Sequence, residues 1–192
     1  MLERRAAVKR LLAGRGELLV VSGLGSATYD VGAAGDDDRN FYLWGAMGGA
    51  VMIGLGLALA RPDRRVLVIT GDGEMLMGMG SLASVAAQRP PRLAIIVLDN
   101  GVFGETGMQP SHTGGATDLA AIARGCGIAR TLEVEDDAAL AELADLVQRS
   151  EETLFARVRI APDDHPRVLP LRDGVALKLR FRRALGLQAT FS

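Results

Sequence analysis

The segment VLVITGDGEMLMGMGSLASVAAQRPPRLAIIVLDNGVF, residues 66 to 103, decides the fold of this chain. It contains two apolar runs, residues 66–69 and 93–98, and each run ends in a turn of glycine and of residues with side-chain oxygens. A helix-length stretch separates the runs. This order is typical of a β-α-β unit, whose strand ends lie side by side at one edge of a parallel sheet. The sequence therefore predicts that Asp72 and Asn100 are neighbours in space although 28 positions separate them.

Both turns carry ligands that a hard divalent cation prefers. The Asp72 carboxylate, the Asn100 amide oxygen and nearby carbonyl groups suit Mg²⁺ or Ca²⁺ better than zinc. Because Mg²⁺ completes its coordination shell with phosphate oxygens and water, this pair predicts a phosphorylated cofactor. Gly71 and Gly73 would admit phosphates to backbone N–H groups, and the helix from about Glu74 would direct its positive end at them. Either turn alone is ordinary turn chemistry, but both together at this spacing favour a binding site.

These turns resemble the signature of the thiamine diphosphate enzymes, in which GDG ends one strand and an Asn follows the next. The similar stretches are GDGE at 71–74, DNGVFG at 99–104, GAMGGAVMIGLGLALA at 45–60 and GETGMQP at 104–110. In detail the chain is most similar to the small cofactor-binding subunits of sulfopyruvate decarboxylases, and next to phosphonopyruvate decarboxylases. The resemblance implies an α/β fold, with a doubly wound, mostly parallel sheet and helices on both of its faces.

The resemblance also implies roles for individual residues. Magnesium would be bound by the side chains of Asp72 and Asn100 and by the backbone carbonyl of Val102. The residues implied to contact thiamine diphosphate are Gly23, Leu24, Ser26, Gly45, Ala46, Met47, Gly71, Gly73, Glu74 and Phe103. Two positions depart from residues that the family often has: Asp99 stands in place of Asn, and Glu74 in place of Ser. The role of Glu74 is left open, because a diphosphate repels a neighbouring carboxylate.

A second corner of the chain has the form of an anion site. Residues 17–21 are expected to form the first strand, which runs into the glycine turn 22–26 and a helix from about Ala27. The match to GxGxxG is incomplete, so this corner ranks second. The remaining elements expected from periodicity and caps are helices over residues 2–13, 118–123 and 138–149, a helix after Gly73, and strands over residues 41–43, 132–134 and 154–160.

Length and composition limit the possible classes of protein. With 192 residues and 48% hydrophobic content, residues 1–192 are expected to form one domain, with residues 162–192 as a C-terminal arm. The net charge of −1 gives no reason to expect nucleic acid or an anionic membrane as a partner. The uncharged stretch 46–60 is too short to span a bilayer and predicts a buried or interfacial helix. The single cysteine, Cys126, excludes an internal disulfide and predicts a reducing, cytoplasmic location.

Three features allow two interpretations each. Met75, Met77 and Met79 favour adaptable core packing over a special surface. His112 is equally compatible with a surface loop and with contact to an anionic substrate. The arm carries four basic residues between 178 and 183 among apolar ones, and it packs either on its own domain or around a partner subunit.

The function implied by the resemblance is one half of a thiamine diphosphate- and Mg²⁺-dependent 2-oxo acid decarboxylase, most closely one that converts sulfopyruvate to sulfoacetaldehyde and carbon dioxide. In that family the essential glutamate comes from a pyrimidine-binding domain, for which this chain has no room. We therefore expect no catalytic residue on this chain and an α subunit that completes the active site, in a hetero-oligomer such as α2β2 or larger. Gln109, Ser111 and His112 are candidate contacts for the substrate.

Two alternatives remain open at this point. A split enzyme that acts on phosphonopyruvate or another 2-oxo acid, as a decarboxylase or a carboligase, would share every motif named above. A noncatalytic nucleotide-binding module of the same fold could reuse the GDG corner.

Overall fold

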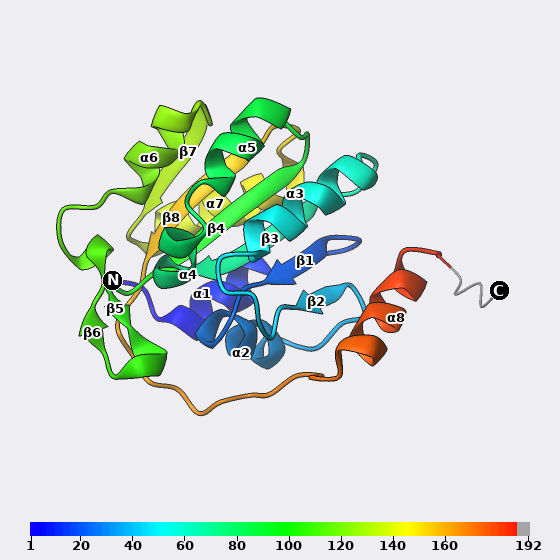
Figure 1. Ribbon diagram of the computed structural model, residues 1–192, viewed down its shortest axis with the longest axis horizontal. Coiled ribbons are helices and arrows are strands. Elements are labelled where there is room, and N and C mark those ends of the chain that lie inside the picture. Colours follow the sequence, from blue (N-terminus) through cyan, green and yellow to red (C-terminus); the bar gives the residue numbers. More distant parts are fainter. Residues whose placement is uncertain (188–192) are drawn as a thin grey trace.

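Six parallel strands form the central sheet of the computed structural model, which describes residues 1–187 (Figure 1). Their order across the sheet is β2-β1-β3-β4-β8-β7. The strands are β1 (Leu19–Ser22), β2 (Asn40–Tyr42), β3 (Val66–Gly71), β4 (Leu93–Asp99), β7 (Arg130–Val134) and β8 (Leu154–Arg159). The short pair β5 (Val102–Phe103) and β6 (Gln109–Pro110) forms a separate antiparallel hairpin. The predicted doubly wound α/β fold is confirmed.

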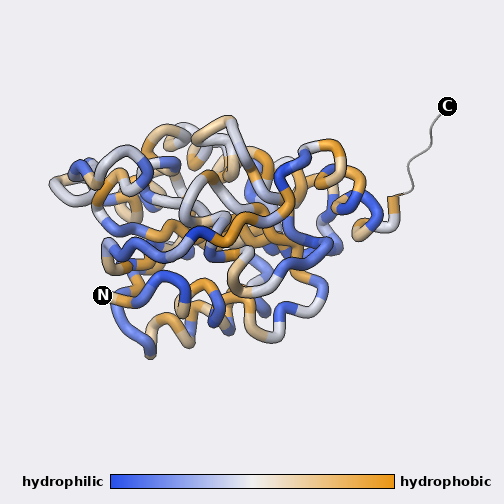
Figure 2. Tube along the Cα trace, turned by 90° about the horizontal axis from the view of Figure 1, so that it is seen from below, coloured by the Kyte–Doolittle hydropathy of each residue, from blue (hydrophilic) through white to orange (hydrophobic). Residues whose placement is uncertain are grey.

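The central strands are buried on both faces, which explains their unbroken apolar sequences. In β3, Val66 and Val68 pack into one hydrophobic core, and Leu67 and Ile69 pack into a second core on the opposite face. Figure 2 shows the apolar strands inside the molecule, with helices of mixed polarity around them. The sheet therefore separates two cores, and each is closed by its own helices.

Helices cover both faces of the sheet. One core is covered by α1 (Arg4–Leu11), α2 (Ser26–Ala33) and α7 (Asp137–Arg149), and the other by α3 (Ala50–Ala60), α4 (Asp72–Met77), α5 (Ser81–Gln88) and α6 (Leu119–Cys126). The chain also forms two 3-10 turns, η1 (Gly104–Thr106) and η2 (His112–Gly114), and a last helix, α8 (Gly174–Ala184). Within residues 1–187, no helix combines the length and the hydropathy needed to cross a membrane.

The stretch expected to form one helix after Gly73 is divided into α4 and α5. The break lies at residues 78–80, where a Cβ atom at Gly78 would lie 2.2 Å from the carbonyl oxygen of Gly48. This close approach of two backbones requires glycine and displaces the chain from a continuous helix. The same contact explains why the helix expected from residue 46 begins only at Ala50, since residues 46–49 form the turn that reaches Gly78.

The prediction that the methionines fill the core is wrong for two of the three. Met75 on α4 is buried, but 68% of Met77 and 37% of Met79 are exposed. Both lie at the helix break, where the chain turns away from the sheet. They therefore contribute to an apolar surface rather than to the interior.

The C-terminal arm packs on its own domain as far as residue 187. Residues 161–173 run as a strap along the molecule and lead to α8, which lies beside β2 (Figure 1). Phe181 packs edge-on against Phe41, with 5.6 Å between ring centroids, and Arg180 pairs with Asp36 at 2.7 Å. The part of the arm from 188 to 192 lies outside the described residues.

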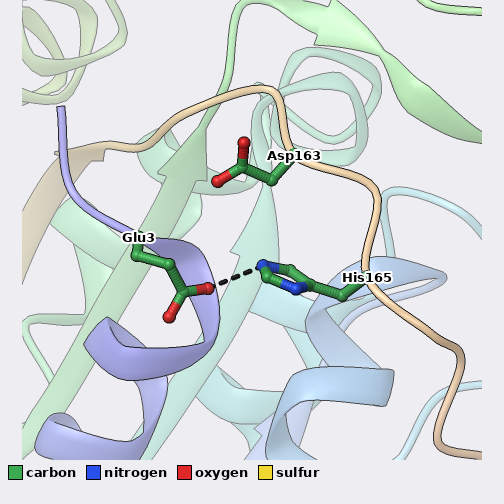
Figure 3. A group of neighbouring side chains, drawn as sticks. All are labelled: Glu3, Asp163 and His165. Carbon is green, nitrogen blue, oxygen red and sulfur yellow. Dashed lines mark ion pairs between the residues drawn. The ribbon is translucent and has the colours of Figure 1, made fainter.

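The residue that caps α1 contacts the strap. Glu3 accepts hydrogen bonds from the backbone N–H groups of Arg5 and Ala6, and its Oε1 lies 2.6 Å from Nε2 of His165 (Figure 3). Figure 3 also shows the carboxylate of Asp163 beside this pair. Because Glu3 both caps the helix and pairs with the strap, this group has a structural role.

Close packing of α3 on β3 predicts a difference between two glycines of one helix. A Cβ at Gly54 would lie 2.2 Å from Cγ2 of Val68, whereas a Cβ at Gly56 would meet open space. We expect Gly54→Ala to lower the free energy of unfolding by about 1–3 kcal/mol through overpacking. Gly56→Ala should be neutral or stabilising by up to about 1 kcal/mol, because alanine favours helix. Urea denaturation of both variants checks this, and equal effects would contradict the packing described.

Candidate cofactor and metal site

A cleft opens at the carboxyl ends of β1, β3 and β4, the edge at which parallel α/β sheets bind ligands. Its cavity measures about 220 Å³. Ten of the residues predicted from sequence line it: Leu24, Ser26, Met47, Gly71, Asp72, Gly73, Glu74, Asn100, Val102 and Phe103. The structure thus brings the GDG turn, the DNG turn and the first glycine corner together.

Asp72 is the first residue of α4, and only 4% of it is exposed. Its Oδ2 accepts hydrogen bonds from the hydroxyls of Ser111 at 2.5 Å and Thr113 at 2.9 Å. Within residues 1–187 it has no cationic partner. Burial raises the pKa of the Asp72 carboxyl, the two hydroxyls partly offset this, and the charge of Asp99 adds to it. A buried carboxylate without a cation is unfavourable, and a divalent cation in the cleft would supply the missing charge.

Asn100 and Val102 also line the cleft. The Asn100 side-chain oxygen accepts a hydrogen bond from the backbone N–H of Val102 at 3.0 Å, which fixes the turn after β4. Gly101 has a φ of +72°, and its Cβ would approach Gly114 to 3.3 Å, so glycine is needed there. A carboxylate, an amide oxygen and a backbone carbonyl on residues that line one cleft form a set of hard oxygen donors that fits Mg²⁺.

The negative charge of Asp99 is compensated by two neighbouring arginines. Asp99 is completely buried, and its Oδ2 pairs with Nε of Arg157 at 2.5 Å and with Nη1 of Arg159 at 3.3 Å. Its Oδ1 accepts a hydrogen bond from the backbone N–H of Gly101, and Oγ1 of Thr113 lies 2.8 Å from it. Both arginines lie on the neighbouring strand β8, so the additional negative charge is neutralised inside the sheet.

Glu74 connects two walls of the cleft. Its Oε2 accepts hydrogen bonds from the backbone N–H of Leu24 at 2.9 Å and from the hydroxyl of Thr70 at 2.8 Å. Its Oε1 is buried without a hydrogen-bond partner among residues 1–187. A Cβ at Gly23 would lie 1.8 Å from Oε2, so the carboxylate occupies the space that glycine leaves at this corner. Glu74 therefore links the turn after β1 to β3.

Six predicted residues do not line the cleft: Gly23, Gly45, Ala46, Gln109, Ser111 and His112. Gly23 lies behind the wall, beside Glu74. Ser111 is buried against Asp72 and thus does not offer its hydroxyl to a substrate in the cleft. Gln109 and His112 are exposed on the flank, where the His112 ring packs edge-on against Phe103.

Sequence reasoning missed several residues of the site. Arg4 lines the cleft while paired with Asp30, which is completely buried on α2, and Glu105 lines it while paired with Arg167 of the strap. Thr113 contacts both buried carboxylates but has no motif of its own. The signal for Thr113 was its position two residues after Ser111 in the segment that follows the DNG turn.

The fold and the cleft define a parallel α/β domain of the kind that binds a phosphorylated cofactor where its strands end. Comparison with known protein families identifies the family to which this domain belongs. The family described as thiamine pyrophosphate enzyme, C-terminal TPP binding domain, matches residues 31–157, and the chain belongs to this family.

Relatives with named activities support the same assignment. The sulfopyruvate decarboxylase subunit beta of Methanocaldococcus jannaschii is 42% identical over 122 residues, which cover 63% of this chain and 64% of that protein. The phosphonopyruvate decarboxylase of Streptomyces viridochromogenes is 46% identical over 125 residues, 65% of this chain and 31% of that protein. The sulfopyruvate decarboxylase of Methanosarcina acetivorans is 33% identical over 186 residues, 96% of this chain and 48% of that protein. The chain thus spans less than two thirds of each of these relatives.

Solved structures confirm the fold. The benzoylformate decarboxylase of Polynucleobacter necessarius superposes with a TM-score of 0.74 at 19% identity, covering 86% of this chain and 34% of that one. At this level of identity the likeness shows the architecture alone.

The Asp99 network predicts a specific rescue. Arg157→Met removes one of the two cations that neutralise a completely buried carboxylate, and we expect a loss of about 3 kcal/mol in unfolding free energy. Adding Asp99→Asn should restore most of that loss, because the buried negative charge is then absent. Urea denaturation of the single and double variants measures both effects. A double variant no more stable than Arg157→Met would contradict this assignment.

The Glu74 corner predicts coupling between two residues 51 positions apart. Gly23→Ala should lower the free energy of unfolding by about 1–3 kcal/mol, because the new Cβ would overlap the Glu74 carboxylate. In a Glu74→Ser chain, Gly23→Ala should lower the free energy of unfolding by a smaller amount. Part of the loss should remain, because Thr70 Oγ1 would lie 2.8 Å from the new Cβ. A double-mutant cycle on unfolding free energy measures the coupling. Additive costs would mean that Glu74 does not occupy this corner.

Proposed function

We propose that this chain is the cofactor-binding subunit of a thiamine diphosphate- and Mg²⁺-dependent 2-oxo acid decarboxylase that converts sulfopyruvate to sulfoacetaldehyde and carbon dioxide. The observation that carries the proposal is the cleft, where the buried Asp72 carboxylate lacks a cationic partner among the described residues and Asn100 lies beside it. The sulfopyruvate decarboxylases among the relatives, one aligned over 96% of this chain, support the choice of substrate.

Each wall of the cleft has a distinct task in this proposal. Asp72, Asn100 and the Val102 carbonyl would hold Mg²⁺, which would neutralise negative charge of the diphosphate. Phe103 lies against Gly73, where a Cβ would come within 2.9 Å of its ring, and Met47 lies beside both. These apolar groups support the rings of the cofactor and exclude water from it. Thiamine diphosphate, when bound, supplies the electron sink that accepts the electron pair of the breaking carbon–carbon bond.

A partner subunit supplies the essential glutamate in this proposal. The two glutamates that line the cleft are already engaged, Glu74 with Leu24 and Thr70, and Glu105 with Arg167. The sulfopyruvate decarboxylase of Methanosarcina acetivorans is about twice as long as the region it shares with this chain, which leaves room there for a second domain. We infer an α subunit with the pyrimidine-binding domain and at least two copies of each chain. The single cysteine supports a cytoplasmic location for this assembly.

An apolar surface beside the cleft fits that partner. The contact between Gly48 and Gly78 places the loop before α3 against the end of α4. Met47, Met52 and Met77, each more than two fifths exposed, come from these segments and from α3. Exposed methionines adjoining a site are typical of surfaces that a partner covers.

Phosphonopyruvate is the second candidate substrate, because a phosphonopyruvate decarboxylase is 46% identical to this chain over 125 residues. Both substrates are 2-oxo acids with a tetrahedral anionic group at the far end. Gln109 and His112, exposed beside the hairpin, remain candidate contacts for that group, together with residues of the partner. Turnover of each substrate by the purified chain with its α subunit decides between them.

The proposal predicts the effect of removing the metal ligand. Asp72→Ala should abolish Mg²⁺-dependent binding of thiamine diphosphate, while its unfolding free energy without ligand stays within about 1 kcal/mol of the parent because an uncompensated charge is lost. Asp145→Ala, an exposed acid on α7, is the matched control and should bind as the parent does. Calorimetric titration with and without the co-expressed α subunit measures binding. Unchanged binding by Asp72→Ala would overturn the metal assignment, and no binding by the parent in either state would overturn the proposed enzyme.

A further inference from the structure

Two buried hydroxyl groups contact the Asp72 carboxylate. Ser111 and Thr113 are 4% and 3% exposed, and they lie where the chain returns from the β5–β6 hairpin into η2. The hydroxyls contact each other at 2.8 Å, and both reach Oδ2 of Asp72. Asp72 also lines the cleft, and among residues 1–187 both side-chain hydrogen bonds to its carboxylate go to Oδ2. The carboxylate thus has one oxygen bound to the protein and one left for a ligand.

We propose that Ser111 and Thr113 are positioning residues that restrict Asp72 to one metal-binding oxygen and thereby select Mg²⁺ over Ca²⁺. This inference rests on the proposed function, since it assumes that Asp72 binds the metal.

The coordination preferences of the two ions provide the physical reason. Mg²⁺ requires near-ideal octahedral geometry and takes one oxygen from each carboxylate, whereas Ca²⁺ accepts six to eight oxygens and often binds both oxygens of one carboxylate. While Oδ2 accepts the Ser111 hydrogen bond and contacts the Thr113 hydroxyl, it is not available as a second ligand. Removal of these bonds would let the carboxylate turn and offer both oxygens, which favours the larger ion.

The surrounding structure keeps the hydroxyls in place. Thr113 Oγ1 also contacts Oδ1 of Asp99 at 2.8 Å, and its carbonyl accepts a hydrogen bond from Arg157 at 3.4 Å. The backbone N–H of Ser111 donates to the Gly101 carbonyl at 2.8 Å, so the segment is tied to the DNG turn. Neither side chain can leave Asp72 without breaking a buried contact, which is expensive. The arrangement therefore fixes the carboxylate before any metal arrives.

Metal selectivity, rather than activity, tests the inference. The full chain, together with its α subunit, is titrated with Mg²⁺ and with Ca²⁺ at saturating thiamine diphosphate, and the ratio of the two affinities is the readout. Thr113→Val and Ser111→Ala remove one hydroxyl each, and we expect each to reduce the preference for Mg²⁺ about tenfold, the usual effect of losing a group that orients a ligand. Thr113→Ser keeps the hydroxyl and should retain the parent ratio.

The ratio of Mg²⁺ affinity to Ca²⁺ affinity distinguishes the possible outcomes. Loss of preference in Thr113→Val with rescue in Thr113→Ser supports the inference, because a merely structural defect would weaken both ions equally. Equal weakening of both ions, or an unchanged ratio, overturns it while the proposed function stands. A parent that binds neither ion overturns the proposed function and this inference with it. Thermal melting without ligand confirms that the variants compared are folded.

Discussion

The structure of the site depends on one unbalanced charge. The Asp72 carboxylate is buried at the first turn of α4, and among the described residues only hydroxyl and backbone groups neutralise any part of it. Folding buries this charge at a cost that a divalent cation would offset. Asp99, the neighbouring buried carboxylate, shows the opposite solution, with two arginines of β8 at its side. This contrast between the two carboxylates favours Asp72 as the position that binds a ligand.

The sheet makes this contrast possible. Because β3, β4 and β8 are adjacent and parallel, the turns after β3 and β4 meet at one edge while the arginines of β8 approach from the side. Glycines then allow the close contacts that complete the cleft, at Gly23 beside Glu74 and at Gly101 beside Gly114. Apolar packing on both faces of the sheet holds these turns in position. Local turn chemistry and global strand order therefore produce a single site.

Much of this arrangement could be predicted from the sequence. Two apolar runs separated by one helix length were sufficient to place Asp72 beside Asn100, because parallel strands of a β-α-β unit end at the same edge. The partners of Asp99 could not be predicted, since Arg157 is 58 positions away and contacts it only through the strand order. The helix break at residues 78–80 depends on contact with Gly48, which no local pattern shows. The sequence predicts contact between Ser111 and the substrate, but the Ser111 hydroxyl donates to the Asp72 carboxylate instead.

In the proposed function, Asp72 and Asn100 bind the divalent ion that carries the cofactor. Anomalous scattering from crystals of the chain with its partner, grown with Mn²⁺ and thiamine diphosphate, locates such an ion directly, because Mn²⁺ shares the oxygen ligands of Mg²⁺. The account predicts one dominant peak in the cleft, bonded to Oδ1 of Asp72 and to the side-chain oxygen of Asn100. A dominant peak elsewhere, for instance beside Glu3, Asp163 and His165, with none at Asp72, would contradict it.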